Sequence, residues 1–167
     1  MKLTADEEYG LRCLLQVGKQ WPEGILTIPA VSRREGISVP HAGKVLQMLR
    51  QGGLVKSARG QSGGYTLAKP PEEILLLDVL AALGGRLYEA EFCQSHKGVV
   101  RICTHSTDCS IRSLWQTVQS AVDDVLGRTT LRDLLRKENE MSSFLGGGEE
   151  VAGAEPRLVV FPVVQDR

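Results

Sequence analysis

The stretch between residues 27 and 67 carries an ordered series of helix-start and helix-stop signals that few folds accommodate. Thr27 can cap a short helix that Gly36 ends, and Ser38 can cap a second helix with Pro40 in its first turn. On the second helix, apolar residues recur at helical spacing and predict a buried face, namely Ala42, Val45, Leu46 and Leu49. The pattern therefore predicts two short helices joined by a tight turn.

A β-hairpin is predicted directly after these helices. Gly52 and Gly53 stop the second helix, and residues 54–58 have the composition of a strand. Residues 59–64 form the predicted turn, and residues 65–67 the returning strand. Two short helices followed by a hairpin make a winged helix-turn-helix, so the predicted fold class is mainly α with a small β-wing.

The other predicted elements are helices. Thr4 and Glu7 have the spacing of a capping box and predict a first helix to about Lys19, while residues 72–83 are apolar and predicted to be mostly helical. The strongest helical pattern follows Ser110 and includes Ile111, Leu114, Trp115, Val118, Ala121, Val122, Val125 and Leu126. Because little else is present to cover it, we expect this long C-terminal helix to mediate dimerisation. A last short helix is expected from Thr130 to about Glu140.

These elements predict five regions. They are a winged helix-turn-helix domain (1–70), a connecting helix (71–89), a cysteine-rich loop (90–110), the dimerisation helix with a short terminal helix (111–140), and a tail expected to be disordered (141–167). The chain shows neither a signal peptide nor an apolar run of roughly 20 residues. We therefore expect a cytoplasmic protein without a membrane partner.

A net charge of zero conceals a basic block between residues 31 and 69. Its basic residues are Arg33, Arg34, Lys44, Arg50, Lys56, Arg59 and Lys69, and its single acid is Glu35. An ordinary solvated surface would show interspersed acids, whereas a one-signed block is typical of a nucleic-acid-binding face. Double-stranded DNA is the predicted partner.

The predicted fold indicates which residues contact the DNA. A recognition helix places its N-terminal residues against base edges, and here these are Ser38, His41 and Lys44. Ser38 is also the predicted cap, so His41 and Lys44 are the better candidates for reading bases. The expected phosphate contacts are Arg33, Arg34 and Lys56.

Three of the four cysteines lie in the polar loop with the spacing C-x9-C-x5-C, namely Cys93, Cys103 and Cys109. In a cytosolic protein, clustered cysteines more often bind metal or do redox chemistry than form structural disulfides. Thiolates suit iron–sulfur clusters, zinc or copper(I). Cys13 stands apart on the apolar side of a helix, where we expect a small buried hydrophobic residue.

The stretch GLVKSARGQSGGYTLAKPPEEILLLDVLAAL resembles the wing and following helix of the Rrf-two family of winged-helix regulators, in particular the cluster-binding branch typified by IscR and NsrR. The resemblance extends to MKLTADEEYGLRCLL and CSIRSLWQTVQSAVDDVLGRTTLRDL, and covers roughly residues 1–137. It implies a homodimeric transcription factor that binds a near-palindromic operator and is not an enzyme. Cluster-binding members hold an iron–sulfur cluster on three cysteines.

The resemblance also implies roles for individual residues. At the wing tip, Arg59 would enter the minor groove, with Gly60 and Gln61 beside it. A 2Fe–2S or 4Fe–4S cluster would be held by Cys93, Cys103 and Cys109. Glu8 would supply a fourth ligand to the other subunit's cluster, with His96, His105 and Asp108 as rivals, although a first-turn acid stabilised by the helix dipole explains Glu8 equally well. One branch has a histidine where this chain has Arg112.

We therefore expect a homodimeric repressor whose operator affinity depends on an iron–sulfur cluster that senses redox state, nitric oxide or iron and cluster status. Two alternatives keep the DNA binding: structural zinc on the three cysteines with His105, and a thiol switch in which two cysteines form a transient disulfide. An electron-transfer protein or enzyme is a remote alternative, because the tight C-x2-C-x2-C run of bacterial ferredoxins is absent.

Overall fold

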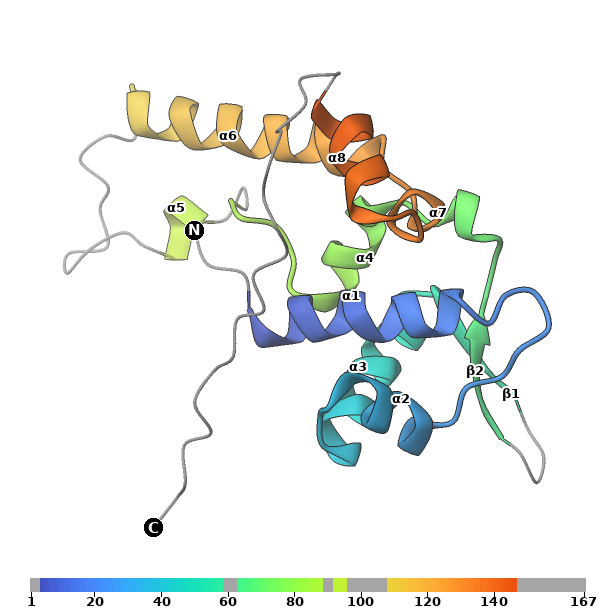
Figure 1. Cartoon of the computed structure of the whole chain (residues 1–167). Helices are drawn as coiled ribbons and strands as arrows, with labels where there is room; N and C mark the ends of the chain where they lie inside the picture. Colours follow the sequence, from blue (N-terminus) through green and yellow to red (C-terminus); the bar gives the residue numbers. More distant parts are fainter. Residues whose placement is uncertain (1–3, 59–62, 89–91, 96–107, 147–167) are drawn as a thin grey trace, which may run out of the picture. The chain divides into compact units, whose positions relative to one another are not determined.

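The computed structural model describes residues 4–58, 63–88, 92–95 and 108–146 (Figure 1). The chain divides into two units, Met1–Arg136 and Lys137–Arg167. The first contains the helix-turn-helix, the wing and helices α4 to α7, and the second contains α8 (Glu138–Gly146). Among the described residues, no helix combines the length and apolar character needed to cross a membrane.

Three helices form the helix-turn-helix unit: α1 (Ala5–Gly18), α2 (Ile28–Glu35) and α3 (Val39–Gln51). Each begins after its predicted cap, because the side chains of Thr4, Thr27 and Ser38 accept hydrogen bonds from backbone N–H groups three residues further on. Gly36 separates α2 from α3 with a φ of 66°, a left-handed conformation that favours glycine. The predicted starts of all three helices are confirmed.

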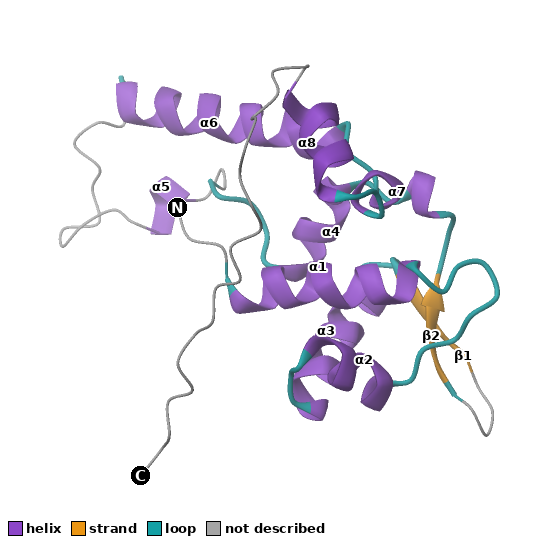
Figure 2. Ribbon diagram, in the orientation of Figure 1, coloured by secondary structure: helices purple, strands orange, loops and turns teal. Residues whose placement is uncertain are grey.

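The wing is a two-stranded antiparallel sheet (Figure 2). Strand β1 (Val55–Ala58) pairs with β2 (Gly64–Leu67), and Val55 lies opposite Leu67. Leu26, just before α2, exchanges two backbone hydrogen bonds of 2.9 Å with Tyr65, which attaches the wing to the helical unit. The wing tip with Arg59, Gly60 and Gln61 lies outside the described residues. A mainly helical fold with a small β-wing is thus confirmed.

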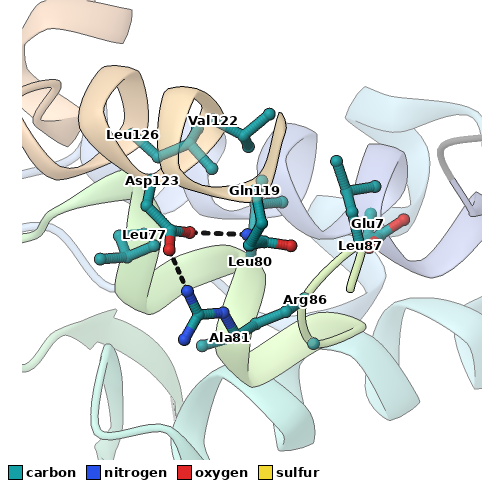
Figure 3. A pocket seen from close by; sticks show the side chains of 11 residues that line it. Glu7, Leu77, Leu80, Ala81, Arg86, Leu87, Gln119, Val122, Asp123 and Leu126 are labelled. Atoms are coloured by element: carbon teal, nitrogen blue, oxygen red, sulfur yellow. Dashed lines mark hydrogen bonds and ion pairs between the residues drawn. The ribbon is translucent and has the colours of Figure 1, made fainter. Parts of the chain in front are cut away.

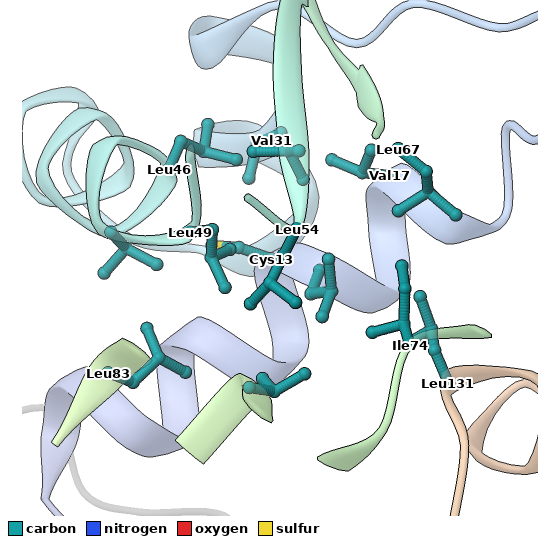
Figure 4. Close-up of a cluster of buried hydrophobic side chains, with 14 of the residues drawn as sticks. Cys13, Val17, Val31, Leu46, Leu49, Leu54, Leu67, Ile74, Leu83 and Leu131 are labelled. Carbon is teal, nitrogen blue, oxygen red and sulfur yellow. The ribbon is translucent and has the colours of Figure 1, made fainter. Parts of the chain in front are cut away.

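One apolar core lies beneath α1, α3, the wing and α4 (Leu76–Leu83). The four residues predicted to form the buried face of α3 are all 0% exposed. Cys13 is also 0% exposed, and Figure 4 shows it among core side chains contributed by several elements, including Leu49, Leu54 and Ile74. Its predicted role as a small buried hydrophobic residue is confirmed. Figure 1 shows α1 between α4 and the α2–α3 pair, so α1 contacts both.

Residues 72–83 are mostly helical, as expected, but they form two pieces and not one helix. A 3₁₀ turn, η1 (Pro71–Glu73), comes first, and α4 begins only at Leu76. Between the two, the backbone forms hydrogen bonds with the segment that follows α6. The N–H of Leu76 donates to the Thr129 carbonyl at 2.9 Å, and the N–H of Leu131 donates to the Ile74 carbonyl at 2.8 Å. Helical spacing in the sequence could not reveal this long-range pairing.

The C-terminal part differs from the expectation in a second way. The long helix α6 (Ser110–Gly127) forms as predicted, but the expected helix from Thr130 to about Glu140 is two helices, α7 (Leu131–Leu134) and α8. Thr130 does cap α7, in a capping box with Asp133. Helix α8 has acids in its first turn, where the helix dipole favours them, and it runs into the range 141–167 where we expected disorder. Residues 147–167 lie outside the described part of the chain.

Candidate DNA-reading face and cysteine site

The N-terminal end of α3 carries the three predicted base-reading residues. The Ser38 hydroxyl accepts the N–H of His41 at 3.3 Å, so Ser38 serves as the helix cap. His41 is partly buried, whereas the side chain of Lys44 is 61% exposed. This end of the helix therefore places one flexible cation and one enclosed imidazole side by side.

Both residues contact Asp6, in the first turn of α1. Lys44 Nζ lies 2.6 Å from Asp6 Oδ2, and His41 Nε2 lies 3.3 Å from Asp6 Oδ1 without the geometry of a hydrogen bond. The hydrogen bond from Lys44 lowers the pKa of Asp6 below its ordinary value. The sequence did not point to Asp6, because Asp6 and Lys44 are 38 positions apart and no local spacing rule connects them.

The expected phosphate contacts lie on two further elements. Arg33 and Arg34 are exposed in the last turn of α2, and Lys56 is exposed on β1. Glu35, the single acid of the basic block, is directed inward, and its side chain is only 8% exposed. Its carboxylate accepts hydrogen bonds from Arg12 Nε at 2.7 Å and Gln16 Nε2 at 2.5 Å, which tie α2 to α1.

Two of the three candidate metal-binding cysteines are described, and both lie beside Arg112. Cys93 is in α5 (Phe92–Ser95), a single turn of helix within the range expected to be loop. Cys109 is the N-cap of α6, and its Sγ accepts the backbone N–H of Arg112 at 3.3 Å. The Arg112 side chain hydrogen-bonds to Cys93, and Tyr88 Oη lies 3.2 Å from Cys93 Sγ.

This environment favours a thiolate at Cys93. The hydrogen bond from Tyr88 lowers the pKa of the Cys93 thiol, and that from Arg112 lowers it further. The hydrogen bond between Tyr88 and Cys93 also raises the pKa of Tyr88, which keeps its proton. Cys109 has the positive end of the α6 dipole beside it. Sequence analysis noted Arg112 only as the residue replacing a histidine, and missed Tyr88.

The other candidate ligands do not join these thiols within the described part of the chain. Cys103, His96 and His105 fall in the undescribed range 96–107, and Asp108 is exposed next to Cys109. Glu8 is exposed on α1. Over residues 4–58, 63–88, 92–95 and 108–146, no three His, Cys, Asp or Glu side chains lie close enough together to hold a metal ion.

Helix α6 has two contrasting faces. Its exposed apolar face consists of Ile111, Leu114, Trp115 and Val125, which are 57%, 57%, 46% and 39% exposed. On the α4 side, Gln119 is buried, accepts the backbone N–H of Tyr88 at 2.8 Å and donates to Asp123 at 2.7 Å.

Asp123 also pairs with Arg86 beside a pocket of about 220 Å³ between α4 and α6 (Figure 3). The bonds of Gln119 and Asp123 fix the backbone that leads to Cys93.

A family model covers almost all of this first unit. The model, Rrf2, is described as an iron-dependent transcriptional regulator and matches residues 3–137. The chain belongs to the Rrf2 family. The predicted family and the winged-helix fold are therefore confirmed.

Individual Rrf2 relatives support the same conclusion. The transcriptional regulator IscR of Vibrio campbellii is 33% identical over 141 residues, which cover 84% of this chain and 80% of that protein. The structure of IscR from T. potens is 29% identical, with a TM-score of 0.63, and covers 81% of this chain and 86% of that one. CymR, the global cysteine regulator of B. subtilis, is 28% identical with a TM-score of 0.61, covering 81% and 96%. The chain is therefore a DNA-binding transcriptional regulator of the Rrf2 family and not an enzyme.

Proposed function

We propose that the chain is one subunit of a cytoplasmic, homodimeric repressor whose affinity for a near-palindromic operator is controlled by an iron–sulfur cluster. Cys93, Cys103 and Cys109 would hold a 2Fe–2S or 4Fe–4S cluster, and Glu8 would be contributed by the partner subunit. The DNA would be bound by α3, the wing and the exposed cations of α2 and β1.

The observation that carries this proposal is the meeting of Cys93 and Cys109 beside Arg112. Two thiols supported by N–H and O–H donors fit a thiolate-ligated group, because such bonds stabilise the deprotonated sulfur that coordinates metal. The family description as iron-dependent and the relatives named IscR support iron as the metal. When bound, the cluster supplies a group that responds to redox change or to nitric oxide.

The residues of this chain would connect that group to the rest of the molecule. Tyr88 is anchored through its backbone to Gln119 of α6 and through its hydroxyl to Cys93. Arg112 reaches both described thiols from the first turn of α6. A change in the ligation or oxidation state of the cysteines would therefore act first on α6. The exposed apolar face of this helix supports a dimer contact.

The test is anaerobic purification of the full chain, followed by a visible spectrum and analysis for iron, sulfide and zinc. We expect brown protein with matched iron and sulfide. Cys103→Ala is expected to abolish the colour, whereas the matched control Cys13→Ala keeps it, because Cys13 is enclosed in the core.

Other outcomes would contradict the cluster. Colourless protein with stoichiometric zinc would indicate a structural metal site, and colourless protein without metal would make a thiol switch the function to test. A full cluster in Cys103→Ala would reject the ligand assignment. None of these results bears on DNA binding, which a salt-dependent affinity measurement tests separately.

A further inference from the structure

Asp6 is an acid of α1 that contacts the base-reading end of α3. Its two carboxylate oxygens face different residues of the recognition helix, Oδ2 at 2.6 Å from Lys44 Nζ and Oδ1 at 3.3 Å from His41 Nε2. Both partners are candidate DNA contacts. An acid from α1 therefore shares the surface on which a polyanion would be bound.

The surroundings of Asp6 hold His41 in a defined place. The ring of Tyr9, one turn along α1, packs edge-on against His41 with ring centroids 5.1 Å apart, and Arg12 lies 5.3 Å from the Tyr9 centroid. Enclosed in this way, His41 Nε2 makes no hydrogen bond of its own. Side chains from the first turns of α1 thus pack against the start of α3 and restrict the position of His41.

Lys44 remains available for a further contact. A lysine ammonium has three N–H donors, of which Asp6 takes one, and the side chain is 61% exposed. A free lysine loses much rotamer freedom when it contacts a base, but one held by a carboxylate has already lost part of it. The paired carboxylate also cancels part of the attraction of Lys44 for phosphates, which every DNA sequence offers equally.

We propose that Asp6 is a specificity-determining residue for DNA: it aims Lys44 at base edges and weakens the binding of DNA that offers only phosphates. The proposal rests on the proposed role of α3 as the recognition helix. Specificity is a difference between two affinities, so a group that lowers binding to the wrong sequence is as effective as one that strengthens binding to the right one.

The test begins with selection of bound duplexes from a random-sequence library by the full-length protein. Affinities are then measured, over a range of salt concentrations, for the selected duplex and for a scrambled duplex of the same composition. We expect Asp6→Asn to bind scrambled DNA more tightly than the wild type. Its log–log salt slope should be steeper by about 0.9, the value for one added phosphate contact.

The ratio of the two affinities should fall about tenfold in Asp6→Asn, which is the order of discrimination given by one base contact. In a Lys44→Met background, Asp6→Asn should leave that ratio unchanged, because Asp6 acts through Lys44. Asp78→Asn is the matched control: Asp78 is also an acid in the first turn of a helix and also pairs with a lysine, Lys69. It should keep the ratio of the wild type.

An unchanged ratio in Asp6→Asn would overturn the proposal, and so would an equal fall in the Lys44→Met background or in Asp78→Asn. Enrichment of no sequence by the wild type would instead contradict the proposed DNA reading itself. Equal unfolding temperatures for the variants would show that a change in the ratio does not come from damage to the fold.

Discussion

The described cysteines occupy two contrasting environments. Cys13 is 0% exposed in the core, and burial raises the pKa of its thiol to about 12. Cys93 is partly exposed, and hydrogen bonds from Tyr88 and Arg112 lower the pKa of its thiol. Because the thiolate is the reactive form, the same functional group should be inert at one position and reactive at the other.

This contrast predicts the alkylation behaviour of the metal-free protein. Cys93 should react with iodoacetamide at neutral pH, and Tyr88→Phe should shift its reaction to higher pH, since the variant loses the largest cause of the lowered pKa. Cys13 should stay unmodified in the native protein. Peptide mass spectrometry, after labelling over a series of pH values, measures each cysteine separately.

Denatured protein provides the control, because unfolding should expose Cys13 and make it react as an ordinary cysteine. An identical pH profile for Cys93 in the wild type and in Tyr88→Phe would show that the Tyr88 hydroxyl does not stabilise the thiolate.

Sequence reasoning at the scale of residues succeeded where the cause is local. The cap at Ser38 and the burial of Cys13 follow from helix-start chemistry and helical spacing. The contacts of Asp6 with Lys44 and of Arg112 with Cys93 were not predicted, because each joins side chains whose proximity depends on how helices pack. The ligand and DNA-contact assignments remain predictions.

At the scale of elements, α1 positions the rest of the first unit. It contacts α2, α3 and α4, and Gly10 lies directly against the Leu83 side chain of α4. A Cβ added at Gly10 would overlap the side chain of Leu83, which is itself buried. Close packing of these two helices therefore requires a residue without a side chain at this position.

Gly10→Ala should lower the free energy of unfolding by roughly 1–3 kcal/mol, the usual cost of overpacking a core. Gly43→Ala is the matched control on α3, since its nearest neighbour, Ile28, is 3.9 Å away. That variant should gain up to about 1 kcal/mol, because alanine favours helix over glycine. Urea unfolding of both variants measures the difference, and a neutral Gly10→Ala would show that α1 and α4 can separate freely.

The element bounds that the sequence predicted well are those with a capping side chain or a terminating glycine, such as the ends of α2. The sequence did not predict the breaks within residues 72–83 and 130–140. There the backbone around Ile74 pairs with that around Thr130, and no helical periodicity records such a pairing.

At the scale of the whole molecule, the apolar face of α6 groups several of the large exposed apolar side chains found in the described part of the chain. Leu114 and Trp115 lie on it, 57% and 46% exposed, while an adjoining side of the helix packs against α4. Large apolar side chains gathered on one helix face are typical of a protein–protein contact. This arrangement supports the proposed homodimer.

Leu114→Glu is therefore expected to produce a monomer that keeps its helical content. Burial of one leucine contributes about 2 kcal/mol, and a symmetric contact contains it twice, so dimer affinity should fall about a thousandfold. Gln116→Glu, which introduces the same charge at an exposed polar position of α6, should remain dimeric. Analytical ultracentrifugation measures both, and a dimeric Leu114→Glu would place the contact elsewhere.

The backbone pairing of Ile74 and Leu76 with Thr129 and Leu131 has a consequence for how such a chain can evolve. It brings together the two ends of the segment that contains α4, the three candidate ligand cysteines and α6. Lengthening a loop with joined ends costs little, about 0.6 kcal/mol for each doubling. The spacing between the cysteines can therefore drift, or be exchanged for another, while the winged helix keeps its place. The segment between these two ends could thus take on a different ligand chemistry while the DNA-binding elements stay unchanged.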